Sequence, residues 1–325
     1  METDIVALGE LLIDFTEYGK SDAGMRLFEQ NPGGAVANVV CAGARLGLST
    51  AFIGKVGSDI HGEFLSSALK AEGVDVRNLI LDDKRFTTMA FVALSGSGER
   101  SFGFFRNGSA ADTSLRAEDI DRELIKNSKI LHIGTISMTH EPARNATLAA
   151  VETARGASAL ISCDVNFRAG LWESEELMLG RTRALLPMVD FLKISGDEAK
   201  LLTGESDPEL SSRILMQTYP LSVVAVTLGE KGALVRTPSG IARVCAVQTT
   251  AVDTTGAGDC FWASFLYAFL VSGIQYKNIG LSDAEKYARF AAAAASICVE
   301  SRGAIPAMPQ LNAVLARMKQ RADSR

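Results

Sequence analysis

Short, predominantly apolar runs alternate with amphipathic stretches through most of this chain. Such runs are typical of strands buried on both faces of a parallel sheet, and the stretches between them carry the 3.6-residue periodicity of helices. The succession therefore predicts an α/β fold: a doubly wound, mainly parallel sheet with helices on both faces. The expected strands of this sheet cover residues 5–8, 51–56, 130–133, 159–165, 191–194 and 223–228. The expected helices cover residues 35–46, 61–72, 141–154, 173–186, 197–203, 209–218 and 283–299.

One part of the pattern does not fit a strand–helix succession. Residues 87–94 and 100–106 flank the loop Ser95–Glu99, which is typical of an antiparallel hairpin. We expect this hairpin to join strands within 11–28 in a small second sheet, and Asn31–Gly34 to break the chain sharply before the helix at 35. The sequence thus predicts a single domain, 1–325, with a lid formed by about 11–30 and 87–107 inserted in it.

The segment Ala251–Asp259 combines turn residues with the start of an apolar helix. Gly256, Ala257, Gly258 and Asp259 should present free backbone N–H groups at the positive end of the helix dipole, which favours an anion. A carboxylate beside a bound phosphate is repelled unless it has a function, and Asp259 can accept a proton from an attacking hydroxyl. The alternative is that Asp259 only caps a core helix.

Other polar residues stand where predicted strands end. Asp14 leaves the sheet after the first strand, and the side chains of Asp164, Asn166 and Arg168 share one face if the chain stays extended. Glu198 begins a helix, where capping is the simpler interpretation. Residues 227–232 form a Gly-x-x-Gly turn, which by itself indicates only a hairpin. The alanines at 291–295 fit either core packing or close approach of a flat ligand.

Composition and missing motifs exclude several classes of function. The net charge of −5 and pI near 5.4 give no reason to expect nucleic acid or a membrane surface as partner. The five cysteines and three histidines lack the spacing of a zinc site. Gly54-Lys55 does not fit a Walker A motif, and Gly9-Glu10 does not fit a dinucleotide fingerprint. An acidic N-terminus and the lack of an apolar stretch of about 20 residues argue against a signal peptide and a membrane span, so we expect a cytoplasmic protein.

Two segments together resemble a known family. Residues 33–47, GGAVANVVCAGARLG, and 253–259, DTTGAGD, look like the paired signatures of the ribokinase-like (PfkB) carbohydrate kinases, and the likeness covers nearly the whole chain. Residues 7–14, 51–57, 104–112 and 227–232 look most like fructokinases. The resemblance implies ATP-dependent phosphorylation of a sugar hydroxyl, most simply the conversion of D-fructose to fructose 6-phosphate. It also implies Mg²⁺ as a cofactor.

The family's functional residues carry over onto positions of this sequence. Asp259 matches the catalytic base, and Gly256, Ala257, Gly258 and Asp259 match the anion hole. Matches to sugar-binding positions are Asp14, Gly33, Gly34, Asn38 and Arg106. Matches to nucleotide-binding positions are Asn166, Arg168, Lys193, Ser195, Glu198, Thr227, Gly229 and Gly232. Glu198 also matches a residue that places Mg²⁺ through water, and Asp253, Thr255, Cys298 and Gly303 resemble the K⁺ loop of some relatives.

Departures from the family pattern leave other functions open. Ser195 and Ala292 stand where many relatives have asparagine, which affects the expected Mg²⁺ and adenine contacts. One alternative is a kinase for another sugar or sugar acid, such as 2-keto-3-deoxygluconate, with Arg106 facing the carboxylate. A more distant one is a nucleotide-dependent sugar sensor without turnover. An exposed lid sheet would also allow a homodimer.

Overall fold

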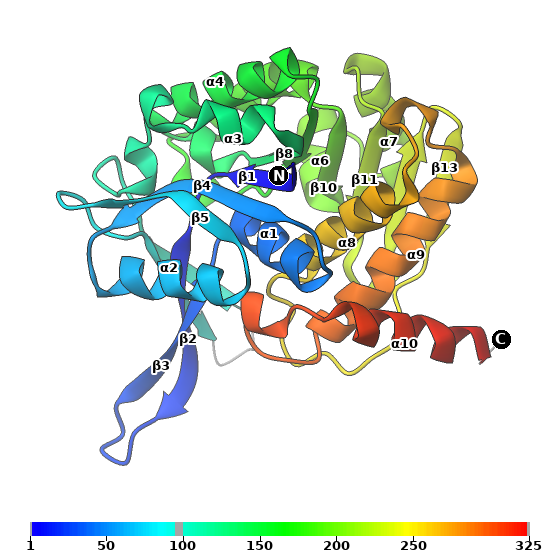
Figure 1. Ribbon diagram of the computed structural model, residues 1–325. Coiled ribbons are helices and arrows are strands. Elements are labelled where there is room, and N and C mark those ends of the chain that lie inside the picture. Colours follow the sequence, from blue (N-terminus) through cyan, green and yellow to red (C-terminus); the bar gives the residue numbers. More distant parts are fainter. Residues whose placement is uncertain (1, 95–99, 324–325) are drawn as a thin grey trace.

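The computed structural model describes residues 2–94 and 100–323, whose strands form two sheets (Figure 1). The larger sheet contains β1 (Thr3–Leu8), β4 (Thr50–Gly57), β5 (Asp75–Asp82), β8 (Ser128–Gly134), β9 (Leu160–Asp164), β10 (Phe191–Ser195), β11 (Val223–Thr227), β12 (Ala233–Thr237) and β13 (Gly240–Val244). The smaller sheet contains β2 (Leu12–Lys20), β3 (Arg26–Gly33), β6 (Met89–Leu94) and β7 (Arg100–Phe105).

The larger sheet confirms the predicted doubly wound topology. Its strand order is β13-β12-β11-β10-β9-β8-β1-β4-β5, and neighbours are parallel except in the β11–β12 and β12–β13 pairs. From the central β1 the chain first proceeds outward to β4 and β5, and later returns to β8 on the other side of β1. The carboxyl ends of β1 and β8 therefore form a switch point, where open α/β sheets bind their ligands.

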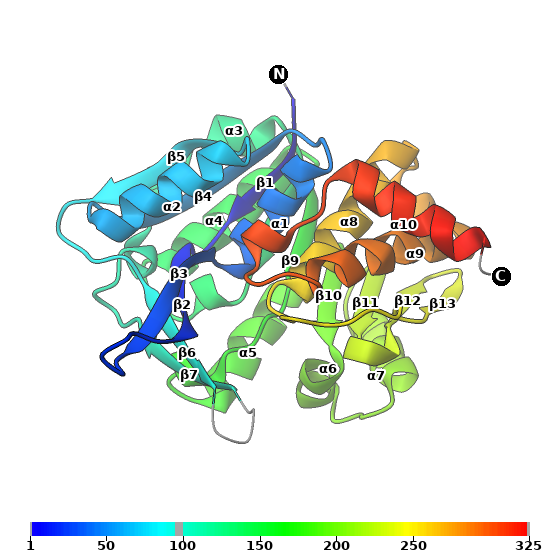
Figure 2. The ribbon, with the colours of Figure 1, turned by 90° about the horizontal axis from the view of Figure 1, so that it is seen from below.

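Helices cover both faces of this sheet (Figures 1 and 2), as the pattern predicted. Side chains alternate between the two cores: Ile5 and Ala7 of β1 enter one apolar cluster, and Val6 and Leu8 enter the other. The first cluster includes residues of α1 (Ala35–Arg45), α2 (Ile60–Ala71), α8 (Ala257–Ser272), α9 (Leu281–Cys298) and α10 (Leu311–Asp323). The second includes residues of α3 (Arg122–Lys126), α4 (Ala143–Gly156), α5 (Glu175–Leu185), α6 (Gly196–Thr203) and α7 (Pro208–Thr218).

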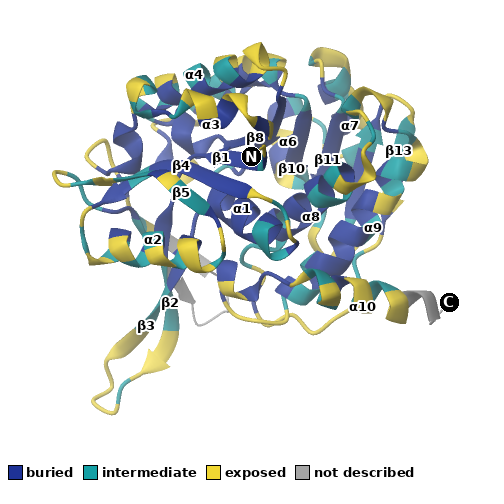
Figure 3. Cartoon of the chain, viewed as in Figure 1, coloured by how far each residue is buried: buried dark blue, intermediate teal, exposed yellow. Residues whose placement is uncertain are grey.

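Burial follows the same layers. Figure 3 shows the central strands buried and the hairpin of β2 and β3 increasingly exposed toward its tip. Among residues 2–94 and 100–323, no helix combines the length and apolar character required to cross a membrane.

The strands of the small sheet pair as expected, but their ends differ from the predicted ones. β6 and β7 are antiparallel as predicted, while the loop 95–99 between them lies outside the described residues. The expected break at Asn31–Gly34 is wrong for its first three residues, because β3 continues to Gly33 and pairs with β2. Pro32 is tolerated there because β3 is an edge strand. The chain turns instead at Gly34, whose φ of 117° is open to glycine.

Two buried carboxylates fix the points where the chain passes between the sheets. Glu10, just before β2, accepts a hydrogen bond on Oε1 from the backbone N–H of Ala35, just after β3, at 2.9 Å. Asp112 accepts on Oδ1 from Thr88 Oγ1 at 2.6 Å and on Oδ2 from Arg106 Nε at 2.7 Å. Since Thr88 precedes β6 and Arg106 follows β7, each carboxylate ties together the two ends of one hairpin.

We expect Asp112→Asn to destabilise the fold by about 3 kcal/mol, the usual cost of leaving one partner of a buried ion pair uncompensated. The Arg106 side chain is fully buried, so the amide would leave its guanidinium without the carboxylate to which it is hydrogen-bonded. Urea denaturation followed by circular dichroism measures the change. Asp75→Asn, which breaks the exposed pair with Arg77, is the control and should cost far less. Equal losses in the two variants would contradict the prediction.

Candidate active site

The start of α8 lacks a side-chain cap. Gly256 precedes the helix with a left-handed φ of 77°, and no side chain among the described residues accepts a hydrogen bond from its first turn. A Cβ at Gly256 would lie 2.8 Å from that of Ala304, and one at Gly258 would lie 2.9 Å from Lys193 Nζ. Glycine at both positions therefore lets neighbouring groups approach the backbone. The N–H of Ala257 donates to the carbonyl oxygen of Thr254 at 3.3 Å, and a helix start without a side-chain cap is a place where proteins commonly bind anions.

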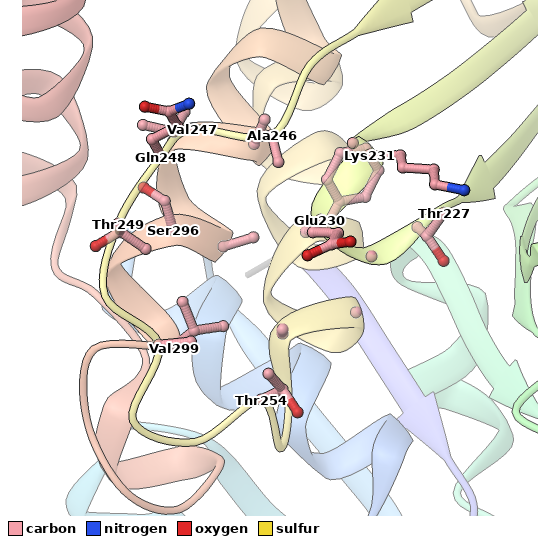
Figure 4. A pocket seen from close by; sticks show the side chains of 18 residues that line it. Thr227, Glu230, Lys231, Ala246, Val247, Gln248, Thr249, Thr254, Ser296 and Val299 are labelled. Carbon is pink, nitrogen blue, oxygen red and sulfur yellow. The ribbon is translucent and has the colours of Figure 1, made fainter.

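Two cavities meet at this helix start. The larger measures about 870 Å³ and the smaller about 340 Å³, and both are lined by Thr254 and Gly258. Figure 4 shows the larger one, with Glu230 and Lys231 on one side and Thr249 and Val299 on the other. Two ligands, one in each cavity, would therefore come into contact at the start of α8.

Several residues predicted to bind nucleotide line the larger cavity. Thr227 and Gly229 lie at the end of β11, and Gly232 closes the turn into β12. Gly232 has a φ of 93°, and a Cβ there would clash with the carbonyl oxygen of Val244. The close packing of β13 against the predicted turn therefore also requires glycine at position 232.

The alanine run of α9 confirms core packing, and part of it also lines the larger cavity, where approach of a flat ligand stays a prediction. Ala291 and Ala294 are fully buried in the core, whereas Ala292 and Ala295 line the larger cavity. One face of the helix packs against its neighbours, and the adjacent face keeps the cavity wide. The adjoining wall, Ala246–Thr249, was not predicted because its sequence is neither glycine-rich nor charged.

The smaller cavity collects polar residues from the carboxyl ends of β1, β9 and β10 and from the starts of α1 and α8. The predicted residues that line it are Asp14, Gly34, Asn38, Asn166, Arg168, Lys193, Ser195, Glu198, Thr255, Gly256, Gly258 and Asp259. Gly33 is not among them. It lies in β3, where a Cβ would clash with the carboxylate of Asp14, so its absent side chain makes room for Asp14.

Asn38 and Asp259 are joined across 221 residues of sequence. Asn38 Nδ2 donates to Asp259 Oδ2 at 2.7 Å, and both side chains are buried. This bond holds one carboxylate oxygen and fixes the orientation of the other. Asn38 Oδ1 is buried and has no hydrogen-bond partner within the described residues.

Acidic groups are crowded around the smaller cavity. Burial raises the pKa of Asp14 to about 6; Arg168 lowers it, while the charges of Asp259 and Asp253 raise it further. Lys193 supplies a buried cation, donating to both oxygens of Asp164 at 3.0 and 2.8 Å. Burial opposes its charge, but the neighbouring carboxylates outweigh this and raise the pKa of Lys193. A cation therefore stays next to the amides of α8.

Glu198 caps a helix and also lines the cavity. Its Oε2 accepts from Ser195 N at 2.8 Å, Ser195 Oγ accepts from Glu198 N, and its Oε1 accepts from Phe167 N at 2.6 Å. The capping alternative is therefore correct, and both oxygens already have backbone partners. Such a carboxylate fits contact with a metal through water better than direct coordination.

The expected extended path from Asp164 to Arg168 is wrong. β9 ends at Asp164, and Asn166 takes a left-handed φ of 43°. Asp164 pairs with Lys193, while Asn166 and Arg168 line the smaller cavity. The turn, rather than strand alternation, brings these side chains to the site.

The structure does not place Arg106 on the cavity wall. Its guanidinium donates to Asp112, to Thr139 Oγ1 at 2.7 Å and to the carbonyl oxygen of Ile136 at 3.1 Å. Buried hydrogen-bonding partners determine its orientation, so it supports the root of the small sheet instead of facing a ligand.

The residues of the expected cation loop do lie together. Asp253 accepts from Thr255 N at 2.9 Å and from Gly303 N at 3.1 Å, and Cys298 Sγ lies 4.0 Å from the carbonyl oxygen of Thr255. Asp253 therefore joins the loop before α8 to the segment after α9.

The sequence did not indicate seven residues that line the smaller cavity: Glu10, Leu12, Thr16, Ala35, Phe104, Ile136 and Thr254. Glu10 is fully buried, and this burial raises its pKa to about 7, although hydrogen bonds from the backbone lower it. Its place directly after the central strand was an available signal. Thr16 and Phe104 lie on the small sheet, and only the docking of that sheet brings them to the cavity.

We expect Asp14→Asn to stabilise the protein by about 3 kcal/mol at pH 8 and much less at pH 4, since each unit by which burial raises the Asp14 pKa corresponds to about 1.4 kcal/mol. The folded state binds the Asp14 proton more tightly than the unfolded chain, so this contribution to stability is present at low pH and is lost as pH rises through about 6. Asparagine removes the cost of the buried charge. Thermal unfolding of both proteins across this range provides the measurement. An equal effect at both pH values would contradict it.

Comparisons with known proteins agree with this geometry. The pfkB family carbohydrate kinase model matches residues 2–311. A probable fructokinase-7 of Arabidopsis thaliana is 41% identical over 321 residues, covering 96% of this chain and 92% of the relative. The crystal structure of a fructokinase from Xylella fastidiosa with bound ATP has a TM-score of 0.90 at 30% identity and covers 99% of this chain and 100% of that one. A double mutant of the Vibrio cholerae O395 fructokinase, solved with fructose, ADP and potassium ion, has a TM-score of 0.85 at 30% identity, covering 97% and 98%. The chain belongs to the pfkB family of carbohydrate kinases.

Proposed function

We propose that this protein is a fructokinase that transfers the γ-phosphoryl group of ATP to the 6-hydroxyl of D-fructose. The observation that carries the proposal is the junction of two cavities at the uncapped start of α8, beside the Asp259 carboxylate. The larger cavity has room for a nucleotide, and the smaller offers the carboxylate and amide groups that bind sugar hydroxyls. The relatives named fructokinase, one solved with ATP and another with fructose and ADP, support this assignment.

In the proposed reaction, Asp259 accepts the proton of the sugar hydroxyl as its oxygen attacks the γ-phosphorus. The bond between that phosphorus and the bridging oxygen breaks, and ADP leaves with the electron pair. The amides at 256–259 and the Lys193 ammonium stabilise the charge of the transferring group. Asn38 holds Asp259 Oδ2, so Oδ1 is the proposed proton acceptor.

The donor set fits a metal that is held mainly by the nucleotide. Among the described residues, no group of three or more His, Cys, Asp or Glu side chains could hold an ion. Glu198 would contact Mg²⁺ through water, and the ion would supply charge neutralisation at the phosphates. Potassium, present in the Vibrio cholerae structure, is proposed for the loop of Asp253, Thr255, Cys298 and Gly303.

The small sheet is the proposed lid of a single domain. Thr16 and Phe104 line the cavity beside Asp14, so sugar bound there would be covered by this sheet. Covering the site excludes water, which would otherwise compete with the sugar for the γ-phosphoryl group.

We predict that Asp259→Asn lowers kcat at least about 10²-fold, as for other lost general bases, while sugar affinity stays within about threefold. A coupled assay of ADP release measures the rate, and calorimetry measures binding. Asp283→Asn is the matched control, because Asp283 also lies in the first turn of a helix but contacts neither cavity. Near-normal turnover of the Asp259 variant would refute the mechanism.

The same ADP assay tests the substrate over a panel of sugars and sugar acids. Fructose should give the highest kcat/KM. Preference for an acid such as 2-keto-3-deoxygluconate would favour the alternative kinase, for which Arg168 is the cavity's exposed candidate cation. ATP and sugar binding without turnover would favour a sensor.

A further inference from the structure

Arg302 links the segment after α9 to both strands of the β2–β3 hairpin. Its Nη2 donates to the carbonyl oxygen of Glu17 at 3.1 Å, and its guanidinium lies 5.3 Å from the centre of the Tyr18 ring. Its Nε lies 3.5 Å from Glu29 Oε2. Because Glu17 and Tyr18 belong to β2 and Glu29 to β3, a single side chain spans the proposed lid.

The same segment is bonded to the loop that leads into α8. Gly303, the next residue, donates its backbone N–H to Asp253 Oδ2 at 3.1 Å. The other oxygen of Asp253 accepts from the backbone N–H and the hydroxyl of Thr255. Residues 302–303 therefore contact the hairpin on one side and the start of the anion site on the other.

We propose that Arg302 is a positioning residue that latches the lid to the α8 loop, so that the sugar-covering sheet and the anion site are held in register. This inference rests on the proposed function, which gives the small sheet its role as a lid. Arg302 itself is not catalytic, because it lines neither cavity.

The chemistry of the contacts suits a latch that opens and closes. The side chains of Arg302 and Glu29 are 43% and 39% exposed, and ion pairs at such sites are individually weak. The Glu29 Oε2 atom is nevertheless buried and has no hydrogen-bond partner within the described residues, so the guanidinium is the cation that neutralises it. A planar guanidinium can also lie over Tyr18 while donating to Glu17, an arrangement that the point charge of a lysine ammonium reproduces only in part.

Backbone hydrogen exchange of the free protein tests the latch without reference to any substrate. We expect Arg302→Ala to increase exchange rates about tenfold in 12–20 and 26–33, with unchanged exchange in the central strands of the large sheet. Arg302→Lys should give an intermediate effect. Glu29→Gln should also accelerate exchange, and should add little in the Arg302→Ala background. Arg289→Ala is the matched control, since Arg289 is a partly exposed arginine paired with Glu285 on α9.

Kinetics test the consequence. Arg302→Ala should raise the KM for fructose and the ratio of ATP hydrolysed to sugar phosphorylated, each about fivefold to tenfold, with the KM for ATP unchanged. The latch would be overturned if the hairpin of Arg302→Ala exchanged its amide hydrogens at the wild-type rate. It would also be overturned if exchange were faster but the KM for fructose and the ratio of ATP hydrolysed to sugar phosphorylated were unaltered. Accelerated exchange in a protein that does not phosphorylate fructose would leave the latch supported and refute the proposed function instead.

Discussion

The start of helix α8 is the constraint on which the site depends. No side chain among the described residues caps its first turn, Gly256 enters it in a left-handed conformation, and Gly258 leaves room for the ammonium of Lys193. The same helix carries Asp259 into the junction of the two cavities. Backbone geometry at two glycines thus places a positive dipole, a cation and a carboxylate within one turn, which is an arrangement suited to moving an anionic group onto an alcohol.

Electrostatic cost accompanies this arrangement. Asp14, Asp164 and Asp259 share a largely buried space, and burial, followed by the charges of neighbouring carboxylates, raises the pKa values of Asp14 and Asp164 although Arg168 and Lys193 lower them. A fold optimised for stability alone would not collect these carboxylates. The large apolar cores on both faces of the sheet stabilise the protein enough to tolerate them.

The fold could be predicted well from the sequence because hydrophobic periodicity depends only on the order of residues within each short segment. Runs such as 130–133 and 191–194 can be buried on both faces only in a covered parallel sheet, and the hairpin around 95–99 required a separate one. The expected break at Asn31–Gly33 failed because edge position, a tertiary property, allows proline in β3. The orientation of Arg106 also depends on tertiary structure: the sequence shows a charge at the end of a strand, but its partners Asp112, Thr139 and Ile136 lie farther along the chain.

By itself, the sequence determined the α/β class and the paired signatures. It also placed Asp259 and its glycines at the start of a helix, because a turn followed by a helix is encoded within a few neighbouring residues. Only the tertiary structure decided that Asn38 bonds to Asp259, that Glu10 and Asp112 tie the ends of the two hairpins, and that Arg302 spans β2 and β3. Apart from the bond between Arg106 and Asp112, these contacts join residues 24 to 285 positions apart. Local patterns carry no information about such pairs, since packing of the whole chain selects which distant polar groups meet.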